Sequence, residues 1–171
     1  MIDFIILNVL YDAPFNMYTL KKIINEKYSF FTKVSMGTLH PALNMLNVNG
    51  YISIEKSITE GGQRKSKYSI TPEGKDYFHQ LMAESLPEHP SRAELIINIK
   101  LVSLYREDDK TKISLIQEII RYYELAKINT ERLLKNKQAD NICYESLIVS
   151  HVRCYDERIR ILGNLINKIK I

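Results

Sequence analysis

Residues 35–71 read SMGTLHPALNMLNVNGYISIEKSITEGGQRKSKYSIT, and this stretch decides the fold. Ser35 can cap a helix, because its hydroxyl can accept a bond from a free backbone N–H of the first turn. Gly50 is expected just past the end of that helix, where glycine is the usual residue. Between them, leucines recur at spacings of four and three, which predicts an amphipathic helix with one buried side. These leucines are Leu39, Leu43 and Leu46.

A basic hairpin follows this helix. Apolar and polar residues alternate over 52–58 and again over 67–70, and Gly61-Gly62 supplies a turn between them. Basic and amide side chains crowd the turn, namely Gln63, Arg64, Lys65 and Lys67. A helix that begins with polar residues, beside a hairpin with a cationic tip, is typical of a winged helix-turn-helix.

Other helices surround this stretch. The segment 2–11 is mostly apolar and favours a short buried helix. Thr19 is expected to cap a second helix, and Thr71 followed by Pro72 a fourth, since proline fits the first helical position. We therefore assign residues 1–85 to a winged helix-turn-helix domain.

The second half of the chain is predicted to be helical. Residues 86–90 read LPEHP and form a linker to a second domain, 86–171. The capping box at Ser91 to Glu94 opens a fifth helix, and acidic residues at 107–109 open a long sixth one. A turn near Ala139-Asp140 precedes the last helix. The expected fold class is mainly α with a small β wing, in which a winged helix-turn-helix is joined to a helical, coiled-coil dimerisation domain.

The last helix carries a heptad pattern. Its apolar residues alternate steps of four and three for three heptads, as in a coiled coil: Ile148, Val152, Tyr155, Ile159, Leu162, Ile166 and Ile169. One interpretation packs this stripe inside its own chain. The other packs it against another chain, and is favoured because only three C-terminal helices share a very large apolar surface. The pattern therefore favours packing between chains.

Composition restricts the class of protein. The chain has 171 residues and a net charge of +4, so it is long enough for a core and only mildly basic. Two cysteines, Cys143 and Cys154, indicate a reducing compartment rather than a disulfide framework. The N-terminus lacks a signal-peptide pattern, and no apolar run reaches the ~18 residues of a membrane span. We expect a cytoplasmic protein with no membrane partner.

The candidate DNA contacts come from the second helix, the third helix and the hairpin. Hydroxyl, imidazole and amide groups on the third helix can bond base edges, whereas hairpin cations suit phosphates or the minor groove. Side chains near the start of the second helix would add backbone contacts. The set is Tyr18, Lys21, Ser35, Thr38, His40, Asn44, Gln63, Arg64, Lys65 and Lys67. A solvated helix surface and a solvated charged turn are the alternative interpretation of the same residues.

In this order, these elements resemble the PadR family of bacterial winged-helix transcription regulators. The segments that carry the resemblance are YTLKKI at 18–23, VSMGTLHPAL at 34–43, Leu46, GYI at 50–52, EGGQRK at 60–65 and KYSITPEG at 67–74. Each segment alone is weak, but their order with the wing and the following Thr-x-x-Gly is specific. The second half, in which LPEHP leads into RAEL at 92–95, resembles the longer subfamily with a helical C-terminal domain, as in the virulence-gene activators.

The resemblance implies a homodimer that is held by its C-terminal helices and binds a palindromic operator in double-stranded DNA. Some family members respond to small phenolic or multidrug-like molecules, which adds a small aromatic effector to the expected partners. The family usually has tyrosine where this chain has His40, and a His-Gly pair where it has Asn16-Met17. The usual contact of that tyrosine is therefore not carried over to His40.

No catalytic or metal centre is expected. His151 and Cys154 stand three apart on the last helix, and two ligands do not make a metal site. No Gly-x-Ser-x-Gly pattern, Cys/His pairing or paired carboxylates support catalysis. We expect a regulator that is not an enzyme and has no cofactor. The alternative from another class is a winged-helix interaction module or coiled-coil adaptor that does not bind DNA.

Overall fold

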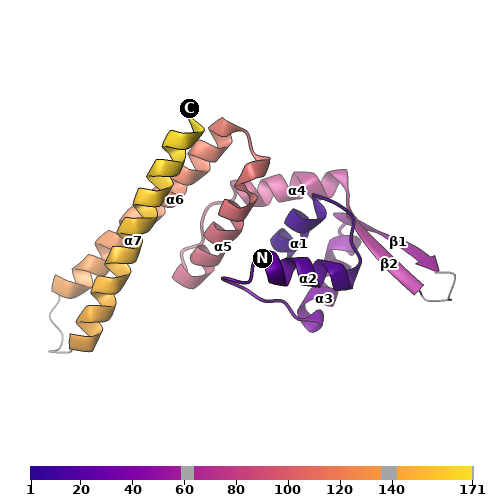
Figure 1. Cartoon of the computed structure of the whole chain (residues 1–171), viewed down its shortest axis with the longest axis horizontal. Coiled ribbons are helices and arrows are strands. Elements are labelled where there is room, and N and C mark those ends of the chain that lie inside the picture. Colours follow the sequence, from indigo (N-terminus) through magenta and orange to yellow (C-terminus); the bar gives the residue numbers. More distant parts are fainter. Residues whose placement is uncertain (59–63, 136–141, 171) are drawn as a thin grey trace. The chain divides into compact units, whose positions relative to one another are not determined.

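The computed structural model describes residues 1–58, 64–135 and 142–170. Its elements, in chain order, are α1 (Ile2–Leu10), α2 (Met17–Lys27), α3 (Met36–Val48), β1 (Ile52–Ile58), β2 (Arg64–Ile70), α4 (Pro72–Ala83), α5 (Pro90–Ser103), a short 3-10 helix (Leu104–Arg106), α6 (Asp109–Lys135) and α7 (Ile142–Ile169). They group into two compact units, Met1–Ser103 and Leu104–Ile171 (Figure 1). None of the described helices combines the length and apolar content of a membrane span. The expected class, mainly α with a two-stranded wing, is confirmed.

Helix α1 is the centre of the first unit. Its sequence IDFIILNVL is apolar on nearly every side, and seven of its nine residues are buried against neighbouring helices. Phe78 of α4 packs between Phe4 and Tyr11, with ring centroids 5.4 and 5.3 Å apart. The buried side-chain amide of Asn8 in α1 donates to the Tyr28 hydroxyl at 2.5 Å, so this polar group has a hydrogen-bond partner inside the core.

Helix α3 begins and ends as the sequence predicts. Ser35 Oγ accepts from the Thr38 N–H at 3.1 Å, which confirms the cap. At the other end the Tyr51 N–H bonds the Leu46 carbonyl at 2.9 Å and the Gly50 N–H bonds the Asn47 carbonyl at 3.0 Å. Gly50 has a φ of 74°, so this is a Schellman ending whose left-handed position suits glycine.

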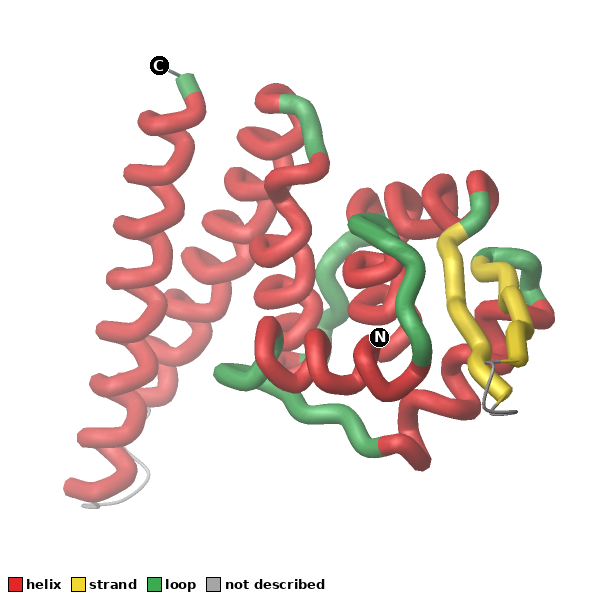
Figure 2. Tube along the Cα trace, turned by 45° about the vertical axis from the view of Figure 1, so that its right-hand side comes forward, coloured by secondary structure: helices red, strands yellow, loops and turns green. Residues whose placement is uncertain are grey.

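The strands form the wing. β1 and β2 pair antiparallel, from Ile52 opposite Ile70 to Ile58 opposite Arg64. Figure 2 shows the two strands side by side next to the helices of the first unit. Ile52 is buried at the root, whereas Ile58 is 72% exposed, so only the root of the hairpin belongs to the core.

Two predicted helix starts are wrong. Helix α2 begins at Met17 rather than after Thr19, because Asn16 caps it by accepting from the Thr19 N–H at 2.8 Å, and asparagine is the better cap. Helix α5 begins at Pro90, so Ser91 lies inside the helix and does not cap it. Proline at the first helical position moves the start two residues earlier than a cap at Ser91 would give, and the Ala93 N–H bonds the His89 carbonyl.

The second unit is built on a helical hairpin. Helices α6 and α7 lie side by side in both views (Figures 1 and 2). Across them, Arg158 donates to the hydroxyl of the buried Tyr123 at 2.8 Å, and Lys127 Nζ lies 2.6 Å from an Asp156 carboxylate oxygen. The turn predicted near Ala139-Asp140 lies outside the described residues.

The heptad stripe of α7 has a partner in its own chain. Ile148, Leu162 and Ile166 are buried, and Tyr155 places its ring 5.9 Å from Tyr123 of α6. The other stripe residues, Val152, Ile159 and Ile169, are half-buried. A role of the stripe between chains stays a prediction. So does the domain division at 85/86, which rests on linker composition.

Candidate nucleic-acid interface

Helix α3 presents one surface to the core and another to solvent. The three leucines of its stripe are at most 2% exposed, so they hold the helix in the first unit. The polar residues predicted on the opposite side are all exposed: Ser35, Thr38, His40 and Asn44. These side chains take no part in the packing of the core. They are therefore available to a binding partner that lies along this side of the helix.

The polar side chains of α3 are bonded in pairs. The Ser35 and Thr38 hydroxyls lie 2.9 Å apart, and Ser35 also caps the helix. His40 Nδ1 lies 3.3 Å from Asn44 Nδ2, one helical turn away. Each pair therefore limits how its side chains can turn towards a partner.

Sequence reasoning missed the apolar part of this surface. Met45 is 63% exposed and Val48 83% exposed, and they stand one and four residues after Asn44. The sequence could have predicted this exposure, because the spacing of these two residues from the leucines places them away from the buried stripe. Apolar side chains on a groove-facing helix can contact the methyl group of thymine.

The turn between α2 and α3 is fixed by one side chain. Asn25 Nδ2 donates to the Val34 carbonyl at 3.0 Å, and Asn25 Oδ1 accepts from the Val34 N–H at 2.7 Å. Val34 directly precedes the cap of α3, so these two bonds hold the start of α3 against α2. Asn25 belongs to no motif that pointed to this role in the sequence.

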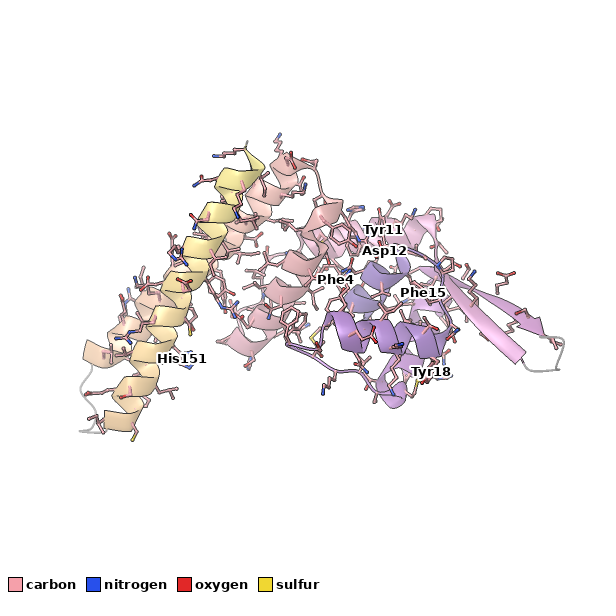
Figure 3. All side chains as sticks on the ribbon, viewed as in Figure 1. Phe4, Tyr11, Asp12, Phe15, Tyr18 and His151 are labelled. Carbon is pink, nitrogen blue, oxygen red and sulfur yellow. The ribbon has the colours of Figure 1, made fainter. Side chains whose placement is uncertain are left out.

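The start of α2 is exposed. Tyr18 is 73% exposed and appears on this helix in Figure 3, while Lys21, one turn later, is half-buried. A spacing of three places both on one side of the helix. The N-terminus of a helix also carries free N–H groups and a partial positive charge, which favour anions.

The wing root and the start of α2 meet around a hollow. Phe15 bonds Tyr68 of β2 through both backbone groups, at 3.1 and 2.8 Å, which draws the segment before α2 against the strand. The resulting hollow is about 210 Å³. It is lined by Pro14, Phe15, Asn16, Thr19, Ser57, Ser66 and Lys67. The fold thus brings Lys67 to the positive end of a helix, a juxtaposition that no sequence spacing predicts.

The wing also places an acid beside its basic residues. Glu55 pairs with Lys67 in the strand register, and both are exposed. Directly opposed strand residues share a side of the sheet, so this carboxylate offsets part of the Lys67 charge. Arg64 and Lys65 lie in β2 opposite Ile58 and Ser57, and Gln63 falls outside the described residues.

His151 and the two cysteines lie within the described ranges of the chain. Within residues 1–58, 64–135 and 142–170, no group of three or more His, Cys, Asp or Glu could hold a metal ion. The rings of His151 and Tyr155 are tilted by 34°, with centroids 6.4 Å apart. Figure 3 labels His151 on α7. Cys143 and Cys154 form no disulfide bond and are exposed on α7.

Comparison with known proteins identifies the family. Residues 6–80 match the Transcriptional regulator PadR-like family. A transcriptional regulator from Clostridium thermocellum is 34% identical, with 46% of this chain and 76% of that chain covered and a TM-score of 0.43. PadR from Bacillus subtilis in complex with operator DNA is 13% identical over 98% of both chains, with a TM-score of 0.46. The B. subtilis complex with p-coumaric acid is 13% identical over 99% of both chains, with a TM-score of 0.45.

A search of curated proteins gave no match. The family match falls on the helices and the hairpin that form the interface described above. The chain belongs to the PadR-like family of transcriptional regulators and carries the winged-helix domain of that family at residues 6–80.

Proposed function

We propose that the protein regulates transcription as a homodimer that binds a palindromic operator, with one α3 helix in the major groove of each half-site. The observation that carries this proposal is the exposed polar surface of α3, opposite a fully buried leucine stripe and on the same unit as the wing. The major groove admits an α-helix, and hydroxyl, imidazole and amide groups can read its base edges.

Phosphate contacts complete the proposed interface. The hollow that joins Lys67 to the start of α2 offers an ammonium group and helix N–H groups to one phosphate. Tyr18 and Lys21 would contact the same strand of DNA. Arg64 and Lys65, at the start of β2, and Gln63, which precedes them in the sequence, would hold further phosphates or enter the minor groove.

Selection of bound duplexes from a random pool tests the DNA-binding proposal. We expect a consensus with dyad symmetry, and an affinity that falls steeply as salt rises because bound cations release counterions from DNA. A pool that shows no enrichment, together with a monomer that ignores every duplex, would favour the alternative of a protein-interaction module.

The proposed dimer contact lies on the second unit. Apolar side chains remain exposed on α6 and α7 after the two helices pack together, namely Leu125, Ile128, Ile142, Leu147, Val149 and Ile161. An open groove of about 750 Å³ follows α7 and includes Glu145, Arg153 and Glu157 among its lining. A surface with both signs of charge can complement itself across a two-fold axis, which supports a second copy as the partner.

A small aromatic effector also has a candidate site, within the first unit. A pocket of about 240 Å³ is lined by Met1, Phe4, Tyr77, Leu81, Glu84, Ser85, Pro87, Arg92 and Ile96. Burial, reinforced by the Asp3 charge, raises the pKa of Tyr77, so its phenol stays neutral. The pocket is smaller than the ~300 Å³ of typical drug sites, so only a small molecule would fit.

Calorimetry with p-coumaric acid as the probe tests the effector site. We expect binding that weakens in Arg92→Gln, because a guanidinium group is a strong partner for a carboxylate. Equal heats for the wild type and the variant would contradict this site.

A further inference from the structure

We propose that His40 and Asn44 act as one base-reading unit, and that this unit selects adenine at one position of each half-site. The inference rests on the proposed function, since it assigns a specificity to the helix that enters the major groove. The observation behind it is the hydrogen bond that joins the two exposed side chains on α3.

The bond determines where the protons lie. Asn44 Nδ2 stands 3.3 Å from His40 Nδ1. An amide nitrogen carries only hydrogens, so it donates, and His40 Nδ1 must accept with its lone pair. The imidazole proton is then on Nε2, which points a donor away from Asn44.

The bond also determines what Asn44 shows to the groove. After it gives one N–H to His40, the amide keeps its other N–H and its Oδ1 acceptor. An exposed asparagine without such a bond can turn its amide about χ2, whose preference is roughly two-fold, and exchange the two atoms. While the His40 proton is on Nε2, this bond holds the donor and the acceptor of Asn44 in one order.

That order matches one base. Adenine presents an acceptor at N7 beside a donor at N6, and an asparagine amide meets both at once. Guanine presents two acceptors at the same place, so Asn44 Oδ1 would face an acceptor and lose its bond. Cytosine offers only a donor at its groove edge, so the amide N–H would go unmet.

The first experiment compares selected binding sites. Wild-type protein and the variants Asn44→Ala, His40→Leu and His40→Gln are each used to select duplexes from a random pool. We expect an adenine in the wild-type half-site that is lost with Asn44→Ala and with His40→Leu. His40→Gln should retain it, because a glutamine four residues away can accept the same Asn44 N–H. Gln80→Ala, which removes an exposed amide from α4, is the matched control and should leave every position unchanged.

The second experiment changes one atom of the DNA. The selected adenine is replaced by 7-deazaadenine, which lacks the N7 acceptor. Wild-type affinity should fall about five- to 150-fold, because the Asn44 N–H that met N7 is left without an acceptor while the bond to N6 remains. Asn44→Ala should bind both duplexes equally.

The outcomes separate this inference from the proposed function. If the wild type binds no duplex in a salt-dependent way, the proposed function fails and the base-reading unit fails with it. If the wild type selects an operator but Asn44→Ala alters no adenine, or 7-deazaadenine binds as well as adenine, only the base-reading unit is overturned. An adenine preference that survives in His40→Leu would overturn the pairing with His40.

Discussion

At the scale of single residues, Gly74 lies where the first turn of α4 passes the backbone of Tyr51. A Cβ atom at this position would stand 2.0 Å from the Tyr51 carbonyl oxygen and 2.9 Å from Ile70 Cγ1. The same carbonyl accepts the Thr71 N–H at 3.1 Å, so it cannot move away without disturbing the cap of α4. The close approach explains why glycine stands three residues after Thr71.

We predict that Gly74→Ala lowers the free energy of unfolding by about 1–3 kcal/mol, as expected for overpacking. Urea denaturation would measure the change. Gly163→Ala in α7 is the matched control, because nothing lies within 4 Å of its added Cβ. It should raise stability by up to ~1 kcal/mol through better helix propensity. Equal effects of the two substitutions would contradict the clash.

Lys67 is the residue whose charge the structure places most clearly beside a helix N-terminus. Lys67→Gln should reduce the slope of log affinity against log salt by ~0.9, the value for one lost phosphate contact.

Glu55→Gln should tighten binding, because it removes the carboxylate opposite Lys67. Fluorescence anisotropy over a salt series measures both effects, with Lys110→Gln on α6 as the control cation. An unaltered slope in Lys67→Gln would remove the hollow from the interface.

At the scale of the elements, the helix-turn-helix depends on Asn25. Its side-chain amide bonds both the N–H and the carbonyl of Val34, as a neighbouring backbone would do in a regular element. Asn25→Ala should lower the free energy of unfolding by about 1–3 kcal/mol, since the buried Val34 would lose both bonds. Asn129→Ala, an exposed asparagine on α6, should change it by no more than ~0.5 kcal/mol. Urea denaturation that finds the two variants alike would show that the turn does not need this clamp.

Helix α6 has an acid-sensitive start. The Thr111 N–H and hydroxyl, at 2.9 and 2.7 Å from the two Asp108 carboxylate oxygens, lower the Asp108 pKa from its ordinary value of 3.8. A lowered folded-state pKa stabilises the fold above the ordinary pKa, and this contribution is lost as pH falls through the folded value. We predict that the urea midpoint of Asp108→Asn falls less on acidification than that of the wild type. Parallel acid profiles would contradict the cap.

At the scale of the whole molecule, the second unit has two apolar surfaces, one buried and one exposed. The heptad stripe is covered by α6 of the same chain, whereas Ile142 and Val149 remain 77% and 37% exposed. The double variant Ile142→Glu with Val149→Glu should be a helical monomer with weakened operator binding, because charge at an apolar contact between copies is costly. Light scattering after gel filtration measures the mass.

Leu162→Ala provides the contrast, because Leu162 is buried within the hairpin. It should lower the free energy of unfolding by about 2–5 kcal/mol without changing the mass of the folded species. A dimer that survives both glutamates, or dissociates in Leu162→Ala, would place the contact between copies on the heptad stripe instead.

Short-range features were predictable from the sequence. The caps at Ser35 and Thr71 and the glycine at position 50 act within one helical turn, so local chemistry settles them. The cap of α2 was mispredicted where two suitable residues, Asn16 and Thr19, competed three positions apart. The exposure of Thr38, His40 and Asn44 also followed from the leucine period alone.

By itself, the sequence determined the type of fold, the helix that faces solvent and the polar residues exposed on it, because periodicity and capping are local properties. Only the tertiary structure decided which charges meet. The hollow at Lys67 depends on Phe15 bonding Tyr68 across more than fifty residues, and the opposition of Glu55 to Lys67 depends on strand register. The partner of the heptad stripe was undecidable for the same reason, since an apolar period shows that a surface is covered but not which helix covers it.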